Sequence, residues 1–375
     1  MHYLFLSWRD LAHPLAGGSE VLVDRLARGL LERGHRVDVL CGGPAGDRPY
    51  PVVSVGGTYT QYLNAPLRYL LDHRRADVVV DVVNGMPYLS PLWRRRPTVS
   101  LVNHVHTEHW RLWYPEPLAA LGRSIESRLF PAVHGRRLVV AVSASTAAAL
   151  IDIGIPPASI RVVHNGVDQP EAPVPESPDP LFLAAGRLVP HKRFDVLLRL
   201  WDRVRPVVGG RLVVIGDGPE RDRLRAMAGP GVSLPGWVSD EQKHRLMAEA
   251  RLLLHPASVE GWGLVVMEAA ARGTPTVGFD VAGVRDSVED GRSGALVATE
   301  EEFADAWTWL ALDGRRRRAL GRYARTRAGS FTWSATVDRF CEVGEEAVAG
   351  APYAARVPLP PVAPVPAAAT GGPRA

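Results

Sequence analysis

Two glutamates separated by seven residues, Glu260 and Glu268, lie around a glycine-rich turn in the segment HPASVEGWGLVVMEAAARGTPTVG. Residues 250–257 have the pattern of a buried parallel strand, SVEGWG that of the turn at its carboxyl end, and LVVMEAAARG that of the following helix. Glu260 is therefore expected in the loop, and Glu268 one or two turns into the helix. Two carboxylates in these places could accept hydrogen bonds from the hydroxyl groups of a sugar.

The backbone of the same turn is suited to binding an anion. Gly261 and Gly263 let the main chain approach a ligand closely, and we expect both glycines and Trp262 between them to bind the donor. The amides of Gly263, Leu264 and Val265 stand at the helix N-terminus, where free N–H groups and the helix dipole favour a phosphate. Carboxylates beside an anion site suit a nucleotide sugar, because its hydroxyls need acceptors and its diphosphate needs donors.

A second cluster of charge lies in GRLVPHKRFD, where Arg187 ends an apolar run and Lys192 precedes the helix that Phe194 opens. Arginine can grip a phosphate through two parallel hydrogen bonds, and lysine adds a compact charge. Arg187 and Lys192 are therefore matched to a leaving diphosphate. Alone, the segment could equally be a solvated loop. Considered together with the Glu260–Glu268 segment, the phosphate interpretation is favoured.

The N-terminal half contributes a glycine pair and several histidines. Gly18 precedes a helix that begins near Ser19, so its backbone could touch a phosphate from the opposite wall of a cleft, although a plain strand-to-helix turn is the alternative. His104 and His106 end the run TVSLVNHVH, and either could hydrogen-bond a sugar hydroxyl. A metal site at these histidines is disfavoured, because no helical HExxH spacing and no second cluster accompany them.

The sequence lacks the common cofactor motifs. GDGPERDRL does not complete G-x-G-x-x-G, and no G-x-x-x-x-G-K-[ST] loop occurs. No Asp-x-Asp pair is present to hold a divalent cation against a diphosphate. We therefore expect neither a metal nor another cofactor. The charge of the diphosphate would instead be balanced by Arg187, Lys192 and helix N-termini.

The composition favours a two-domain protein of a reducing compartment. At 375 residues the chain exceeds one doubly wound core, so two domains of about 150–200 residues are expected. Two cysteines, Cys41 and Cys341, exclude a disulfide framework and fit the cytosol. A net charge of +4 is too weak to indicate nucleic acid, and no segment predicts a membrane span or a secretion signal. The run LWRRR at 92–96, with Trp110 and Trp113, could touch a membrane peripherally or an acceptor, although a mobile acceptor loop whose aromatic side chains pack locally is slightly favoured.

Apolar runs alternate with helical patterns, which predicts two Rossmann-like α/β domains with doubly wound parallel sheets. The first half has the expected strands HYLFLS, RVDVLCG, PVVSVG, DVVVDVV, TVSLVNH, RLVVAVS and IRVVHNG, with helices at 19–33 and 118–134. The second half has expected strands at PLFLAAGRL, 211–216, 232–234, 251–255, 274–279 and 294–297, with helices at 194–204, 220–228, 239–249, 264–272, 301–312 and 315–327.

Composition also marks the expected domain boundaries. Residues 1–168 form the first domain, and the proline- and acid-rich segment 169–180 reads as a linker to a second domain at 181–330. Residues 331–349 are expected to form a last helix, which could cross back to the first domain, and 350–375 a disordered tail rich in alanine and proline. Strand ends that face each other place the ligand in the crevice between the domains.

With these residues in view, the chain resembles the family-four retaining glycosyltransferases of GT-B fold over nearly all of residues 1–349. SVEGWGLVVMEAAARGTPTV is similar to the family's E-x7-E signature, GRLVPHK to its arginine–lysine diphosphate clamp, GGSE to its first-domain glycine loop, and VAGVRDSVEDGRSGALV to its closing loop and strand. By that resemblance Glu260 contacts the donor sugar, Glu268 the ribose hydroxyls, and Val238 the base through its backbone. The family's strand-end histidine matches His104 or His106.

The resemblance implies transfer of a hexose or related sugar from a UDP- or GDP-sugar to an acceptor hydroxyl. The implied route keeps the anomeric configuration, attacks on the same face and has no settled protein nucleophile. A sugar-nucleotide epimerase, a phosphorylase and a non-catalytic sugar-nucleotide binder stay open as alternatives. The acceptor could be a lipid-linked glycan, a cell-wall precursor or a secondary metabolite, since specificity resides in first-domain loops around 56–66 and 104–117.

Overall fold

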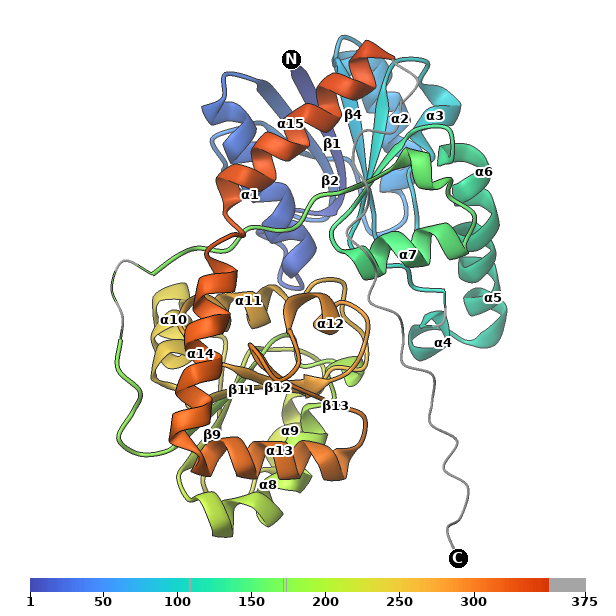
Figure 1. Cartoon of the computed structure of the whole chain (residues 1–375). Coiled ribbons are helices and arrows are strands. Elements are labelled where there is room, and N and C mark those ends of the chain that lie inside the picture. Colours follow the sequence, from blue (N-terminus) through green and yellow to red (C-terminus); the bar gives the residue numbers. More distant parts are fainter. Residues whose placement is uncertain (108, 171, 173, 351–375) are drawn as a thin grey trace, which may run out of the picture.

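In the computed structural model the chain folds into two α/β domains, one above the other in Figure 1. The structure describes residues 1–107, 109–170, 172 and 174–350, so nearly all of the expected tail at 350–375 lies outside the described residues. The strands of both sheets pair in parallel. The expected fold class, two doubly wound parallel sheets, is confirmed.

The N-terminal sheet has the strand order β3-β2-β1-β4-β5-β6-β7, so the order reverses between β1 and β4. Its strands are near-continuous apolar runs such as VVVDVV, typical of a parallel sheet that is covered on both faces. The strands are β1 (His2–Arg9), β2 (Arg36–Gly42), β3 (Val52–Ser54), β4 (Val78–Val83), β5 (Thr98–Val102), β6 (Leu138–Ala141) and β7 (Ile160–Val162). The α-helices are α1 (Gly18–Glu32), α2 (Gln61–Arg68), α3 (Ser90–Trp93), α4 (Trp110–Trp113), α5 (Glu116–Ser124), α6 (Phe130–His134) and α7 (Ala144–Asp152).

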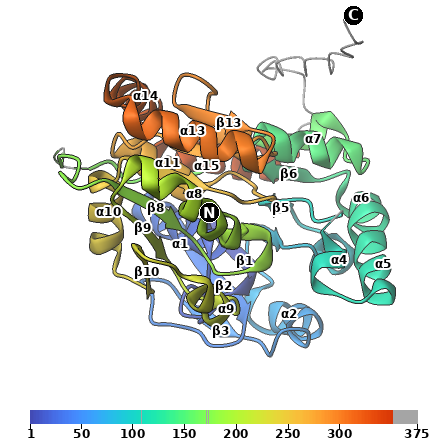
Figure 2. The ribbon, with the colours of Figure 1, turned by 90° about the horizontal axis from the view of Figure 1, so that it is seen from below.

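The C-terminal sheet has the order β10-β9-β8-β11-β12-β13 and reverses between β8 and β11. Figure 2 shows α8 and α13 side by side, and their tryptophans Trp201 and Trp307 stack in the core at 5.5 Å between ring centroids. The strands are β8 (Leu181–Ala185), β9 (Arg211–Ile215), β10 (Val232–Gly236), β11 (Leu252–His255), β12 (Thr276–Phe279) and β13 (Gly294–Val297). The helices are α8 (Phe194–Val208), α9 (Arg221–Met227), α10 (Asp240–Glu249), α11 (Leu264–Ala271), α12 (Val284–Ser287), α13 (Glu300–Leu312) and α14 (Gly314–Ala328).

The last helix, α15 (Trp333–Ala349), leaves the C-terminal domain and packs beside α1 on the N-terminal sheet, as Figure 1 shows. Phe340 stacks on Phe5 at 6.0 Å between ring centroids. A Cβ at Gly29 of α1 would lie 2.4 Å from Cγ2 of Val337, so only glycine allows the two helices to approach this closely. The C-terminal end of the described chain therefore completes the N-terminal core.

The helix expected at 118–134 is present but is not one regular helix. It consists of α5, a π-helical segment (Ile125–Leu129) and α6. Pro131 explains the interruption, because proline has no N–H to donate and its ring clashes with the carbonyl of the preceding turn. A wider π-helical turn relieves that clash. The sequence analysis also did not identify α2 and α7.

Candidate active site between the two domains

A cavity of about 470 Å³ lies between the two domains, beyond the carboxyl ends of the central strands of both sheets. The N-terminal wall comes mainly from the loop after β1 and the ends of β4 and β5. The C-terminal wall comes from the loops after β8 to β11 and the start of α11. The predicted site residues in the lining are Gly18, His104, Arg187, Lys192, Val238, Glu260, Gly261, Trp262, Gly263, Leu264 and Val265, and His106 joins them.

Lys192 and Glu260 form an ion pair in this cavity, with Nζ 2.5 Å from Oε2. The same carboxylate oxygen lies 3.2 Å from Nε2 of His255, a buried histidine at the end of β11 that the sequence analysis did not identify. Burial alone would raise the pKa of Glu260, but the Lys192 ammonium and the His255 imidazole hold that pKa well below its usual range. Glu260 is therefore ionised and held in one orientation.

Glu268, unlike the other predicted site residues, is not part of the cavity lining, but it pairs with a lysine that is. Lys243 of α10 lines the cavity, and its Nζ lies 2.9 Å from Glu268 and 3.0 Å from Asp240. Burial would lower the pKa of Lys243, but the two carboxylates raise it above its ordinary value. Lys192 and Lys243 are the only lysines in the sequence. The sequence analysis missed Lys243, although this rarity could have singled it out.

Arg187 is the third cation of the lining, and it forms no ion pair with any residue in the described part of the chain. It faces the glycine loop of the other domain, because a Cβ on Gly17 would lie 3.3 Å from Nε of Arg187. A Cβ on Gly18 would lie 3.2 Å from Cδ1 of Leu264. The two walls of the cleft therefore come close at this point, with a free guanidinium between them.

The start of α11 has the backbone geometry of an anion site. Gly263 precedes the helix with φ 81° and ψ 59°, in the left-handed region that glycine adopts without strain. Leu264 and Val265 begin the helix, and all three residues line the cavity. Amides in the first turn have no partner inside their own helix. The segment therefore offers donors where the sequence predicted them.

The structure gives Trp262 and Gly261, which both line the cavity, packing roles that the sequence analysis did not predict. The ring of Trp262 is 2% exposed and stacks on His164 at 4.6 Å between centroids, in a core that both domains share. Its ring therefore packs the domains together instead of facing a ligand. A Cβ on Gly261 would lie 2.0 Å from the carbonyl oxygen of Asn103, so this glycine admits the backbone of the opposite domain.

His104 and His106 both line the cavity, with their ring centroids 5.1 Å apart. Burial lowers the pKa of His104 well below its ordinary value, so its imidazole is neutral at pH 7. His106 donates its backbone N–H to Glu126 at 2.7 Å, and its Nδ1 lies 3.3 Å from the same carboxylate oxygen. Glu126 therefore fixes His106, and the sequence analysis did not identify this anchor.

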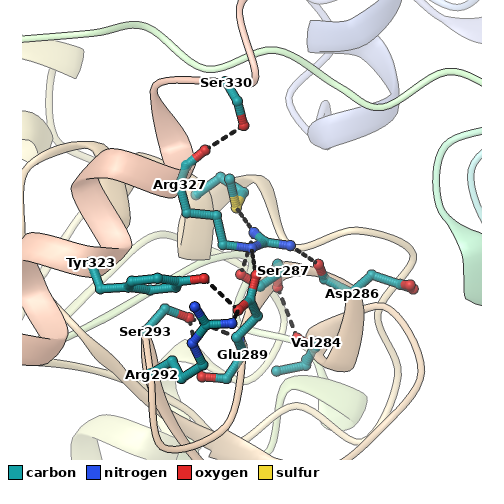
Figure 3. A network of polar contacts seen from close by, with 10 residues as sticks. Val284, Asp286, Ser287, Glu289, Arg292, Ser293, Tyr323, Arg327 and Ser330 are labelled. Carbon is teal, nitrogen blue, oxygen red and sulfur yellow. Dashed lines mark hydrogen bonds and ion pairs between the residues drawn. The ribbon is translucent and has the colours of Figure 1, made fainter. Parts of the chain in front are cut away.

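Beside the cavity, a polar network holds α12 and the loop after it (Figure 3). Arg327 of α14 donates to the carbonyl oxygens of Asp286 at 2.6 Å and Ser287 at 3.0 Å. Its Nε lies 2.9 Å from Glu289 Oε1. The carboxylate of Asp286 in turn accepts a hydrogen bond from the backbone N–H of Ser145, in the first turn of α7, at 3.2 Å. Through this hydrogen bond α12, which Arg327 holds in place, contacts the N-terminal domain.

In the run LWRRR the structure buries Arg94, whereas Leu92, Arg95 and Arg96 are exposed. Arg94 is 2% exposed and donates to the carbonyl oxygens of Ala76 and Asp77 at 2.9 and 2.8 Å. Trp93 donates its indole N–H to Tyr88. Among the described residues, every helix is too short or too polar to span a bilayer.

A group of potential metal ligands found among the described residues lies away from the cavity. It consists of His2, Asp38 and His73. The Oδ2 atom of Asp38 lies 2.7 Å from His2 Nε2, 3.1 Å from His73 Nδ1 and 3.3 Å from the Arg36 guanidinium. These histidine and arginine partners therefore compensate for the burial of the Asp38 carboxylate.

Comparisons with known proteins agree with this architecture. A family model described as Glycosyltransferase Family 4 matches residues 16–169, and one described as Glycosyl transferases group 1 matches residues 168–327. A relative from Stackebrandtia nassauensis, named D-inositol 3-phosphate glycosyltransferase, is 30% identical and aligns with 86% of this chain and 85% of its own length. A relative of the same name from Geodermatophilus obscurus is 30% identical over 96% of this chain and 91% of its own length.

Two solved structures show the same fold at low identity. Anabaena Alr3699/HepE in complex with UDP and glucose has a TM-score of 0.74 and 19% identity, with 92% of this chain and 100% of that chain covered. Sucrose-phosphate synthase from Thermosynechococcus elongatus has a TM-score of 0.80 and 18% identity, with 94% and 100% covered. Family models, relatives and fold thus converge on one assignment: the chain is an enzyme that belongs to the family-4 glycosyltransferases of GT-B fold.

Proposed function

We propose that this enzyme transfers a sugar from a UDP- or GDP-linked donor to an acceptor hydroxyl, with retention of anomeric configuration and without a metal ion. The charge arrangement of the cavity carries the proposal. Lys192 and Lys243 are paired with carboxylates, whereas Arg187 has no ion-pair partner among the described residues. A free guanidinium next to the start of α11 suits a diphosphate.

In this proposal the diphosphate lies between Arg187, Lys192 and the first amides of α11, and the backbone of Gly18 approaches it from the opposite wall. Glu268 accepts hydrogen bonds from the ribose, and the backbone of Val238 meets the base. As the diphosphate departs, the negative charge that develops on it is stabilised by groups already in place. Such preorganised stabilisation is usually the largest contribution to catalysis.

The reacting sugar would lie against Glu260 and His104. The ionised carboxylate of Glu260, held by Lys192 and His255, accepts hydrogen bonds from sugar hydroxyls. The neutral imidazole of His104 offers one donor and one acceptor. The acceptor oxygen attacks the face from which the diphosphate leaves, through an oxocarbenium-like state, and the acceptor proton passes to the departing phosphate oxygen.

The names of similar proteins support the substrate classes. The curated relatives are named for a reaction with D-inositol 3-phosphate, and the solved HepE structure contains UDP and glucose. We also propose that the enzyme works in the reducing cytoplasm, because Cys41 and Cys341 are both free thiols.

Binding and turnover of UDP-, GDP-, ADP- and dTDP-sugars by metal-free protein test this function. We expect one donor to bind by calorimetry and to be hydrolysed slowly, with EDTA leaving the rate unchanged and NMR showing the retained anomer first. Arg187→Gln should weaken binding of that donor at least tenfold, while Arg203→Gln on the exposed face of α8 should not. Absence of donor binding would refute the donor assignment, and strict dependence on Mg²⁺ would refute the metal-free route.

A further inference from the structure

The charged residues that line the cavity are distributed unequally between its two walls. Every charged side chain in the described lining belongs to the C-terminal domain: Arg187, Lys192, Asp217, Asp240, Lys243 and Glu260. The N-terminal wall contains no lysine, arginine or carboxylate in its described part. It is lined by small residues and by hydroxyl, amide, imidazole and indole side chains: Ser19, Asn84, Asn103, His104, His106 and Trp113.

These groups line the N-terminal wall, which faces the wall that contains Arg187 and Lys192. The amides of Asn84 and Asn103 both donate to the hydroxyl of Ser19, at 3.2 and 3.0 Å. The His106 ring lies 5.4 Å from the ring of Trp113, measured between centroids. Trp113 is 40% exposed, so part of its indole is available to stack on a ring. Amides, imidazoles and an indole together suit a polyhydroxylated ring.

The charge behind this wall is negative. The buried carboxylate of Glu126 accepts hydrogen bonds from the backbone of His106 and from the indole N–H of Trp110 at 3.0 Å. At the edge of the cleft, burial and the nearby Lys192 and Arg187 lower the pKa of His191 to about 4, so His191 adds no positive charge at pH 7. An acceptor phosphate, with a charge of about −1.5 to −2, would meet neither lysine nor arginine in the described lining of this wall.

Arg9, at the end of β1, is the N-terminal-domain cation that needs separate consideration. It does not belong to the described lining. Its guanidinium lies 4.2 Å from the Trp8 ring centroid and donates to the carbonyl oxygen of Leu15 at 3.1 Å. Arg187, the free cation of the lining, is already assigned to the donor diphosphate. The charges of Glu20 and Arg187 both act on Arg9, so Arg9 lies near Arg187, and the Arg9→Gln variant below tests whether it receives an acceptor phosphate.

We infer that the acceptor is an uncharged polyhydroxylated ring, such as a neutral sugar or cyclitol, which stacks on Trp113 and binds the polar side chains of the N-terminal wall. The inference rests on the proposed function and deepens it. It separates this enzyme from the curated relatives, whose names specify a phosphorylated inositol.

Matched acceptor pairs test the inference with the donor found above. Each pair contains a neutral polyol and its phosphate monoester: myo-inositol with D-inositol 3-phosphate, and glucose with glucose 6-phosphate. We expect kcat/KM to be at least tenfold higher for the neutral member of a pair. Asn84→Lys, which puts a cation into the N-terminal wall, should raise kcat/KM for the phosphate relative to its neutral partner.

Two further variants separate binding from folding. Trp113→Ala should raise KM for the neutral acceptor at least tenfold, whereas Trp309→Ala, which removes an exposed tryptophan of α13, should not change it. A phosphate ester that is preferred or used equally would overturn the inference, and loss of that preference in Arg9→Gln would identify the missed cation. Donor hydrolysis that no neutral polyol accelerates would also overturn it while leaving the proposed donor chemistry intact. Failure of donor binding would instead remove the proposed function itself.

Discussion

The ion pair between Lys192 and Glu260 joins two segments that the sequence analysis chose separately. Residue type and local motif predicted both groups. Their pairing could not be predicted, because it depends on how loops 68 residues apart meet beyond neighbouring strands. Lys243 was missed for the same reason, since its partner Glu268 is 25 residues away in the sequence. His255 lies only five residues before Glu260, but the turn between them decides whether the two side chains meet. Tertiary contacts, not motifs, give these residues their charge state and orientation.

Replacing Lys192 by methionine tests the role of this pair. The change removes a cation that is proposed to contact the departing diphosphate, and it leaves the buried Glu260 carboxylate without its main partner. We expect kcat/KM for the donor to fall at least tenfold. Loss of one preorganised charge can cost as much as about 10²–10³ in rate. Lys192→Arg should retain more activity than Lys192→Met. Wild-type turnover by the methionine variant, in a protein with an unchanged melting temperature, would contradict the assignment.

Two histidines make the stability of the protein dependent on pH. The pKa of His191 is lowered to about 4 by burial and then by Lys192 and Arg187, and that of His244 to about 4 by burial and then by Arg272 and Lys243. Between about pH 6.5 and 4 the unfolded chain binds protons at these residues and the folded chain does not. The free energy of unfolding should therefore fall as the pH falls through that window.

Urea denaturation at pH 7, 6, 5 and 4.5 measures this effect. Each histidine contributes at most about 1.4 kcal/mol per pH unit, because that is the free energy of one proton per unit. The double variant His191→Gln, His244→Gln should lose less stability between pH 6.5 and 4.5 than the wild type does. An identical pH slope in the two proteins would show that other groups dominate.

At the scale of elements, strands were the most predictable part of the chain. Parallel strands buried on both faces produce apolar runs that a sequence shows directly, and the expected strands are all present within a few residues. Helices with a clear apolar face, such as α1 and α8, were found for the same reason. The helix α7 was not found, because ASTAAALID lacks such a face. Its first turn is capped by Ser143 and by Asp286 of the C-terminal domain.

The turn before α11 contains a glycine whose role only the tertiary structure reveals. An alanine methyl group at Gly261 would lie 2.0 Å from the Asn103 carbonyl oxygen, which is backbone and cannot rotate away. We expect Gly261→Ala to hold the domains apart and to lower kcat/KM for transfer at least tenfold. Each domain should remain folded, because the clash lies between the domains.

Activity and circular dichroism of the same sample distinguish closure from unfolding. Gly229→Ala is the matched control, since the nearest atom to its added methyl group would be a side-chain oxygen of Asp202 at 3.3 Å. Full activity in Gly261→Ala would show that the domains tolerate a wider approach than the structure indicates.

At the scale of the whole molecule, the two domains are joined by the last helix and by a shared part of the core, in addition to the contacts of Asp286 and Gly261 described above. The core of the N-terminal domain includes Phe340 and Val343 of α15, and it continues through Trp262 into the C-terminal domain. A sequence shows that residues 333–349 have an apolar face but not which sheet receives it. The structure shows that the last helix covers the first sheet, beside α1 (Figure 1).

Phe340→Ala tests how much this helix contributes. Phe340 is 1% exposed and contacts Phe5 and Tyr3, so truncation leaves a cavity that its neighbours fill only partly. We expect the free energy of unfolding to fall by about 3–5 kcal/mol in urea denaturation. Val348→Ala, on the exposed side of the same helix, should change it by less than about 0.5 kcal/mol. A change below 1 kcal/mol for Phe340→Ala would mean that α15 docks only weakly.

The two lysines have a practical consequence. Because Lys192 and Lys243 are the only lysines of this sequence and both line the cleft, an acylating reagent finds no other lysine side chain in it. A fluorophore or cross-linker with an activated ester would therefore be directed to the cleft without any engineering. Mass spectrometry of the labelled peptides, with and without nucleotide, would then report occupancy directly, and immobilisation through amines would be the wrong way to attach this enzyme to a surface.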